Sequence, residues 1–360
     1  MFRAIASRAG RRRSAAGFTL VEMLVAMATG TLVLSGSVYL FSRALEGAYV
    51  STNNSAAQQN ARAAMNLMHR DFSLTGTGLP QGGVSLPSGT NATASLLGCD
   101  STQCYLQNDA WLNNHLYPVM PDAVDVRLPN IIGAQTQAAT VVYVDPAWQQ
   151  NPLPIVGFGA NGSSITLDPS LNPASATQGV QAGDVMLLTN PNGNAAAVVT
   201  SVAGNVLNFA DHDVLNMNQS LAAAGNVKAL GIVSSVASNG TKLITPTTTA
   251  SRLFVVTYFL QLNTDGTYRL MRKINARPPM PVADSIENLQ FTYDVFNDAS
   301  GVATAGLADA GISQGMVPSQ VRKINYTITC KTTDLKGRIV RISLNSSASA
   351  RSLSFKDRYD

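Results

Sequence analysis

Residues 18–41 read FTLVEMLVAMATGTLVLSGSVYLF, and this stretch decides the fold. Its one charged side chain is that of Glu22. Because an α-helix rises about 1.5 Å per residue, a helix of this length crosses a hydrocarbon core of about 30 Å. The sequence therefore predicts a single membrane-spanning helix at residues 18–41.

A basic segment lies immediately before the apolar stretch. Its charged residues are Arg3, Arg8, Arg11, Arg12 and Arg13, and the first 17 residues contain no acid. The rest of the chain holds 20 basic and 21 acidic residues, so the net charge of +4 belongs to the N-terminus and does not indicate a nucleic-acid partner. By the positive-inside rule, the N-terminus stays in the cytoplasm and the chain after residue 41 is exported.

The junction between the basic segment and the apolar stretch has the character of a processing site. An ordinary secretory signal carries its small-residue cleavage site after the apolar region, whereas here Gly17 precedes it. The run GFTLVE, from Gly17 to Glu22, resembles the cleavage and methylation motif of type IV prepilins and of type II secretion pseudopilins. The resemblance implies that a prepilin peptidase and methyltransferase cuts between Gly17 and Phe18 and methylates the new Phe18 amine.

Glu22 matches the glutamate at the fifth mature position of that family. A lone carboxylate in an apolar span costs roughly 2.5–3.5 kcal/mol on insertion scales and needs a positive partner. Cleavage after Gly17 creates two, the Phe18 amine and the positive end of the helix dipole. In the family's usual account the partner is the amine of a neighbouring subunit, so either arrangement gives Glu22 a role in assembly. The alternative is a plain signal anchor in which Glu22 has no such role.

Residues 42–78 are expected to continue the helix beyond the anchor. One face is marked by apolar residues at spacings of three or four, namely Ala57, Ala61, Ala64, Met68 and Phe72. The polar run STNNS at 51–55 is a place where the helix could be interrupted. Gly76 and Gly78, with Pro80 just beyond, predict its end.

Residues 79–360 are expected to form a periplasmic β-rich globular domain with a loop-rich insertion at about 82–138. Strands are predicted at 140–144, 185–189, 197–201, 206–209, 252–262, 268–273, 289–296, 321–331 and 339–344. No helical segments alternate with them, which favours a mainly antiparallel sheet. The predicted fold class is α+β, with a long N-terminal helix packed on a β-rich domain in a pilin-like arrangement.

The three cysteines suggest at most one disulfide. Cys99 and Cys104, in the run CDSTQC, are close enough to close a small loop in an oxidising compartment. Cys330 shares one face of a predicted strand with Ile324 and Tyr326, so we expect a buried free thiol there.

Motifs that would indicate chemistry are weak. Residues 157–162, GFGANG, fit a dinucleotide-binding pattern, but a strand-like run follows them and we interpret them as a hairpin turn. The run DHD at 211–213 is interpreted as a solvated turn, and His69 as a solvated residue on a helix. We therefore expect no catalytic residue, cofactor or metal site, and no enzymatic activity.

Several runs are also similar to PilW-type minor pilins: QQNAR at 58–62, LMHRD at 67–71, GTYRLMR at 266–272, and the stretches at 282–293 and 321–330. That resemblance implies a structural minor pilin that helps to prime or cap a type IV pilus. Its expected partners are the prepilin peptidase, other minor and major pilins, and the inner-membrane assembly platform. The expected location is the bacterial inner membrane, with a single pass and a periplasmic C-terminal domain, and afterwards a pilus or pseudopilus filament.

Three other functions are alternatives to a minor pilin. A minor pseudopilin of type II secretion would share the anchor. A filament-tip adhesin would use residues 82–250 to bind a ligand. A membrane-anchored enzyme would need a pocket with convergent titratable groups.

Overall fold

The computed structural model describes residues 17–80, 82–85, 115–121, 136–149, 152–159, 162–173, 179–211, 213, 215, 217–218, 227–230, 248–264, 266–298, 300–310, 315–334 and 337–353. Cys99, Cys104 and the leader apart from Gly17 lie outside these residues. The chain divides into two compact units, Met1–Asn54 with Thr333–Arg338, and Ser55–Thr332 with Ile339–Asp360.

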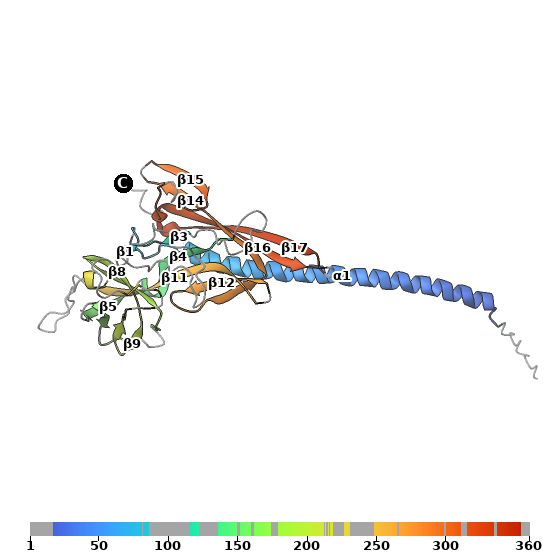
Figure 1. Cartoon of the computed structure of the whole chain (residues 1–360), viewed down its shortest axis with the longest axis horizontal. Coiled ribbons are helices and arrows are strands. Elements are labelled where there is room, and N and C mark those ends of the chain that lie inside the picture. The colour runs from blue at the N-terminus through green and yellow to red at the C-terminus, as the bar shows by residue number, and fades with distance from the viewer. Residues whose placement is uncertain are drawn as a thin grey trace, which may run out of the picture. The chain divides into compact units, whose positions relative to one another are not determined.

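The first element, α1 (Leu20–Ser73), is a helix of 54 residues that runs through the polar stretch at 51–55 without a break (Figure 1). Within the described chain, it is the helix long and apolar enough to cross a membrane. It ends at Ser73, earlier than the predicted boundary at 78, because the Gly76 N–H turns away to bond the carbonyl of Val142 at 2.9 Å. Gly76 and Gly78 adopt φ of +76° and +74°, as expected of glycines that terminate a helix.

The second unit is built from antiparallel strands, as predicted. The described elements after α1 are β1 (Val84–Ser85), β2 (His115–Leu116), β3 (Val119–Pro121), β4 (Ala139–Val144), α3 (Pro146–Gln149), β5 (Leu153–Phe158), β6 (Ser164–Leu167), β7 (Val185–Asn190), β8 (Gly193–Val198), β9 (Ser201–Ala203), β10 (Val206–Asn208), α4 (Val227–Leu230), β11 (Thr249–Leu262), β12 (Tyr268–Ile274), β13 (Met280–Asp284), β14 (Ile286–Asn297), β15 (Val302–Leu307), η4 (Pro318–Gln320), β16 (Val321–Thr333), β17 (Ile339–Ser349) and η5 (Arg351–Leu353).

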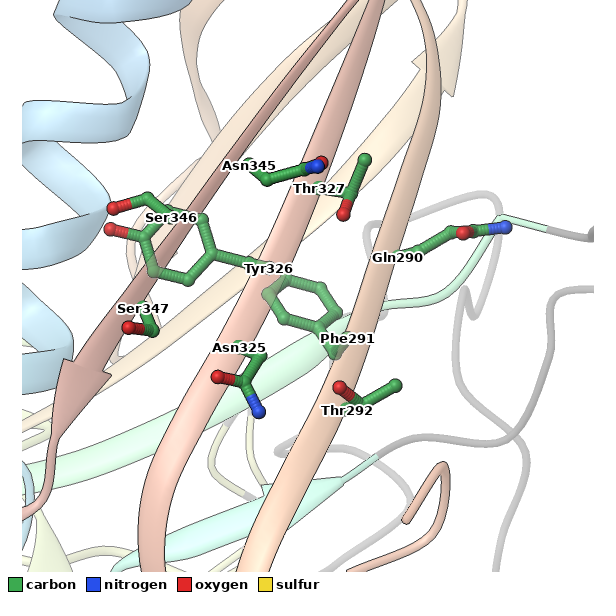
Figure 2. Close-up of a pocket in the computed structure, with 9 residues that line it drawn as sticks. All are labelled: Gln290, Phe291, Thr292, Asn325, Tyr326, Thr327, Asn345, Ser346 and Ser347. Atoms are coloured by element: carbon green, nitrogen blue, oxygen red, sulfur yellow. The ribbon is translucent and has the colours of Figure 1, made fainter. Parts of the chain in front are cut away.

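Two main sheets form among the described residues. An eleven-stranded sheet has the path β13-β12-β11-β5-β6-β10-β9, with β3, β4, β7 and β8 joined beside it. A four-stranded sheet has the order β15-β14-β16-β17. Figure 2 shows three strands of the second sheet, β14, β16 and β17, seen from close by.

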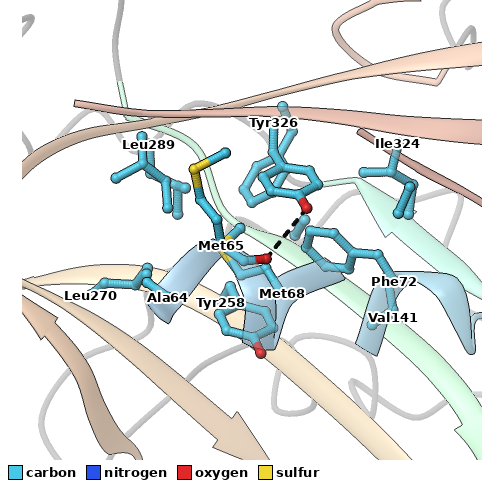
Figure 3. Packing of buried hydrophobic residues seen from close by; sticks show 14 of the residues in the cluster. Ala64, Met65, Met68, Phe72, Val141, Tyr258, Leu270, Leu289, Ile324 and Tyr326 are labelled. Carbon is cyan, nitrogen blue, oxygen red and sulfur yellow. Dashed lines mark hydrogen bonds between the residues drawn. The ribbon is translucent and has the colours of Figure 1, made fainter. Parts of the chain in front are cut away.

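The last part of α1 lies in the main core. Phe72 packs edge-on against Tyr258, Phe291 and Tyr326, with ring centroids 5.6, 5.8 and 5.2 Å apart. Tyr258 belongs to β11 and Tyr326 to β16, so this helix face lies between the two sheets (Figure 3). The predicted apolar face of the helix is confirmed, and burial of each large side chain there stabilises the fold by about 1.5–3 kcal/mol.

A separate apolar cluster forms among β5 to β10. Its largest members are Trp148 on α3, Ile165 on β6, Met186 on β7 and Phe209 after β10. The β5–β6 hairpin contains the glycine run at 157–162, where the Gly159 N–H bonds the carbonyl of Ser164 at 2.9 Å. The described part of that run therefore lies in a β5–β6 hairpin, while residues 160 and 161 lie outside the described residues.

One strand prediction was wrong, and three short strands lie in the described parts of 82–138. The predicted strand at 197–201 covers the end of β8 and the gap before β9. β8 instead begins at Gly193. Its first residues are poor strand formers, so the sequence does not predict a strand there, but they pair in register with β7 from Asn190↔Gly193 to Val185↔Val198. Within 82–138, the short strands β1, β2 and β3 form pairs.

Cys330 is the buried free thiol that its position on β16 predicts. It is 1% exposed, and its Sγ lies 3.7 Å from the carbonyl oxygen of Ala57 on α1. Burial raises the pKa of this thiol to about 11, so it stays protonated and inert at neutral pH.

Candidate processing and assembly site

The helix begins at the predicted processing site with a capping box. Thr19 precedes the first helical residue and Glu22 follows three positions later. The Thr19 N–H and Oγ1–H both donate to Glu22 Oε2 at 2.9 Å, and the Glu22 N–H points back to Thr19 Oγ1 at 3.3 Å. These contacts satisfy amide groups that a helix start otherwise leaves unpaired, and such a cap contributes about 0.5–2 kcal/mol.

The two oxygens of Glu22 are used differently. Oε2 accepts both bonds from Thr19. No described residue donates to Oε1 at this site, so this oxygen can accept a further bond. Glu22 therefore caps its own helix with Oε2, and Oε1 can accept a hydrogen bond from an ammonium group. Such a bond is charge-assisted and stronger than one between neutral groups.

The apolar side chains of the anchor are exposed in the isolated chain. Phe18, Leu20 and Val21 are 90%, 80% and 69% exposed, and the apolar residues along the helix as far as Tyr49 also face outward. A continuous apolar surface of this length requires lipid or other apolar helices around it.

The hydroxyl groups of the anchor are satisfied within the helix. Thr29 donates to the carbonyl of Val25 at 2.9 Å, and Ser37 donates to that of Val33 at 2.8 Å. Thr31 and Ser35 make similar bonds to the preceding turn. Because an unpaired hydroxyl is costly in hydrocarbon, these bonds let the polar residues enter an apolar environment.

Polar side chains mark the other end of the span. The Arg43 guanidinium lies 5.4 Å from the centre of the Tyr39 ring and 3.2 Å from Glu46 Oε2. Aromatic and charged side chains of this kind are typical of the membrane–water interface. They follow the apolar stretch, whose last residue is Phe41.

A buried ionic cluster, which the sequence analysis missed, fixes the last turn of α1. Asp71 is 1% exposed and accepts hydrogen bonds from Tyr143 on β4 at 2.9 Å and from Tyr258 on β11 at 2.6 Å. Arg272 on β12 contributes Nε at 2.7 Å and Nη2 at 3.0 Å. The signal in the sequence was an acid between Met68 and Phe72 on the apolar face, because a buried carboxylate needs a buried cation.

Among the described residues, the others considered from the sequence do not gather into a chemical site. His69 lies exposed on α1. Asp213 accepts hydrogen bonds from the backbone N–H groups of Leu215 and Asn218, while His212 lies outside the described residues. In the part of the chain that the structure describes, no three His, Cys, Asp or Glu side chains gather where a metal ion could bind.

Comparison with known proteins places this geometry in a recognised motif. The family model described as the prokaryotic N-terminal methylation motif matches residues 12–38. This motif is the type IV pilin-like prepilin signal, and it contains Gly17, Phe18, Thr19 and Glu22. No curated protein and no solved structure matches the chain.

The motif and the fold together define the class. The chain has a type IV pilin- or pseudopilin-like prepilin signal, which indicates processing by a prepilin peptidase. The long apolar helix indicates membrane anchoring, and the antiparallel β-rich domain completes a pilin-like α+β fold.

Proposed function

We propose that this chain is a structural minor pilin that takes part in assembly of a type IV pilus, in a priming or tip complex. Prepilin peptidase cuts between Gly17 and Phe18 and methylates the Phe18 amine. Residues 1–17 are the leader, residues 18–41 the membrane and filament-core helix, 42–78 its continuation, and 79–360 the periplasmic domain.

The observation that carries the proposal is the geometry of Glu22 inside the methylation motif. Its Oε2 completes the helix cap with Thr19, while Oε1 has no donor among the described residues. Cleavage would place a new ammonium group at Phe18, adjacent to the cap. Glu22 would then bind that amine or the amine of a neighbouring subunit, and the cost of a carboxylate in the apolar span would be offset by an ion pair.

The minor role rests on size and on similarity. A β domain with two main sheets is bulky to repeat along a whole filament, and several runs of the chain are similar to PilW-type minor pilins. The partners are then prepilin peptidase, other minor and major pilins, and the inner-membrane assembly platform. The chain would reside in the bacterial inner membrane with a periplasmic C-terminal domain before it enters the filament.

The first test determines the N-terminus. The full chain is expressed with and without a prepilin peptidase, and the membrane-bound product is analysed by mass spectrometry. A product that begins at N-methylated Phe18 is expected only with the peptidase. An intact Met1, or a cut after residue 41, would contradict the proposal.

A second test separates processing from assembly. Glu22→Gln keeps the shape of the side chain but removes its charge, so cleavage is expected to continue while incorporation into sheared filaments falls. Deletion of the chain distinguishes the two systems, since loss of surface pili supports a pilus subunit, and loss of secreted enzymes with normal pili supports a type II pseudopilin.

A further inference from the structure

The outer face of the four-stranded sheet carries rows of uncharged polar side chains. Gln290 on β14 lies opposite Thr327 on β16, and Thr292 lies opposite Asn325. Asn345 and Ser347 on β17 extend these two rows across a third strand (Figure 2). Three strands thus present six amide and hydroxyl side chains to one surface.

These rows surround a shallow hollow of about 370 Å³. Phe291 and Tyr326, which alternate with the row residues, are each 1% exposed and face the core, so the strand backbones form the floor. Small-molecule sites in proteins occupy roughly 300–1,000 Å³. The hollow is therefore large enough for one or two sugar rings.

Charged side chains lie beyond the two ends of the hollow and pair with one another. At one end Glu287 pairs with Arg341 at 2.6 Å. At the other end Asp294 pairs with Lys323 at 3.6 Å. No charged side chain lines the hollow itself, so a phosphate, a nucleic acid or an acidic peptide would find no counter-charge there.

Among the described residues, five of the six row side chains at the hollow make no side-chain hydrogen bond, and the sixth, Asn325, donates to Asp294 Oδ1 at 2.9 Å. Thr329 and Ser343, in the next row, bond each other at 2.9 Å. In the described structure, the side chains that make no hydrogen bond are those of Gln290, Thr292, Thr327, Asn345 and Ser347, although each carries donors and acceptors. The free groups thus gather where the sheet is hollowed.

We propose that this hollow binds a neutral oligosaccharide. A sugar offers alternating hydroxyl donors and acceptors without charge, which complements amide and hydroxyl side chains, and the methyl groups of Thr292 and Thr327 contact its apolar ring face. An apolar peptide would leave the row residues buried and unpaired. The proposal is independent of filament assembly, and it places ligand binding on the C-terminal sheet rather than in residues 82–250.

The test uses the full chain in nanodiscs of phosphatidylcholine, because alkyl maltoside detergents carry a sugar of the class under test. Saturation-transfer NMR and calorimetry measure binding of maltotriose, cellotriose and N-acetylated chitotriose, with trigalacturonate as the charged comparison. At least one neutral trisaccharide is expected to bind and the charged one to bind at least about tenfold more weakly, because its carboxylates would be desolvated without a partner.

Two variants locate the site. Thr327→Val removes a hydroxyl at nearly constant volume, and combined with Gln290→Ala it is expected to weaken binding about tenfold or more. Thr304→Val on β15, in the same sheet but outside the hollow, is the matched control and should bind like the parent. Where circular dichroism shows that the double variant is misfolded, Ser347→Ala on the edge strand replaces it.

Three results would overturn the proposal. The first is that no neutral trisaccharide binds at a concentration of about 10 mM. This would mean a binding free energy weaker than about −3 kcal/mol. The second is equal binding by the parent and the hollow variants, which would place the ligand elsewhere. The third is equal binding of trigalacturonate, which would show that charge is not excluded.

Discussion

Asp71 of α1 and Arg272 of β12 form a two-point ion pair, with Nε 2.7 Å from Oδ2 and Nη2 3.0 Å from Oδ1. The carboxylate is 1% exposed, and Tyr143 and Tyr258 donate to it as well. One buried charge on the helix is thus satisfied by three strands, which fixes the rotation and the axial position of the last turns of α1, within the second unit, against the eleven-stranded sheet.

Removal of one partner from this pair should destabilise the domain strongly. Asp71→Ala leaves the Arg272 charge without its counter-ion, and the expected loss is about 3–5 kcal/mol in the free energy of unfolding. Chemical denaturation of the full chain, followed by circular dichroism, measures it. The matched control is Asp284→Asn at the exposed pair with Arg269, where about 0–1 kcal/mol is expected. Equal effects of the two changes would contradict the assigned importance of burial.

The same cluster makes stability depend on alkaline pH. Burial, together with the nearby Asp71 carboxylate, raises the pKa of Tyr143 and of Tyr258 above the ordinary value of about 10. The unfolded chain therefore loses these protons at lower pH than the folded chain. Their contribution to stability is present below about pH 10 and is lost as the pH rises further, by up to about 1.4 kcal/mol per pH unit for each tyrosine.

Denaturation between pH 8 and pH 11 checks this sign. Cys330, whose pKa is raised by burial to about 11, adds a loss of the same sign from about pH 9 upward. Tyr143→Phe should make the decline above pH 10 less steep. A free energy of unfolding that stays constant over this range would contradict the prediction.

A side chain at Gly78, in the turn after α1, should lower the free energy of unfolding. A Cβ there would lie 2.8 Å from the Cβ of Val144, and the residue has φ of +74°. Gly78→Ala is expected to cost about 1–2 kcal/mol for the left-handed backbone and about 1–3 kcal/mol more for the clash. Gly204→Ala, with φ of +60° and no atom within 4 Å, should cost the backbone term alone. Thermal unfolding of both variants separates the two contributions.

The helix cap should affect assembly through Glu22. Thr19→Val removes the hydroxyl that donates to Oε2 and weakens the helix start by about 1 kcal/mol, which corresponds to about a fivefold change in an equilibrium. Thr19→Ser keeps the hydroxyl and is the matched control. The readout is the ratio of subunit in sheared filaments to subunit in membranes, expected to fall for the valine variant alone. A similar fall for the serine variant, which keeps the hydroxyl, would contradict the role assigned to that hydroxyl.

The sequence predicted the parts of the fold that depend on local pattern. Ala61, Ala64, Met68 and Phe72 repeat at helical spacing and are all buried, and Gly76 and Gly78 follow the end of the helix. β13 was missed because Pro281 disfavours a strand, and the structure accommodates it at an edge of the sheet. Such an element exists because a neighbouring strand pairs with it, and local pattern does not contain that information.

The candidate site also has a part that the sequence predicts and a part that it does not. The capping box joins residues three apart, so the motif at Gly17 to Glu22 was recognisable from sequence. The Asp71 cluster joins residues up to 201 positions apart, and its members come from α1, β4, β11 and β12. No single-sequence pattern pairs such distant residues, although the acid on the apolar helix face was a visible sign that a partner exists.

The long separation between Asp71 and Arg272 also orders events during synthesis of the chain. The helix face that carries Met68 and Phe72 is synthesised well before β11, β12, β14 and β16, which supply most of its cover. Until Arg272 has emerged, Asp71 has no counter-ion and the face stays open to water. Because contacts of such high sequence separation form slowly, the new chain passes through a stage in which this apolar face is exposed and prone to aggregate.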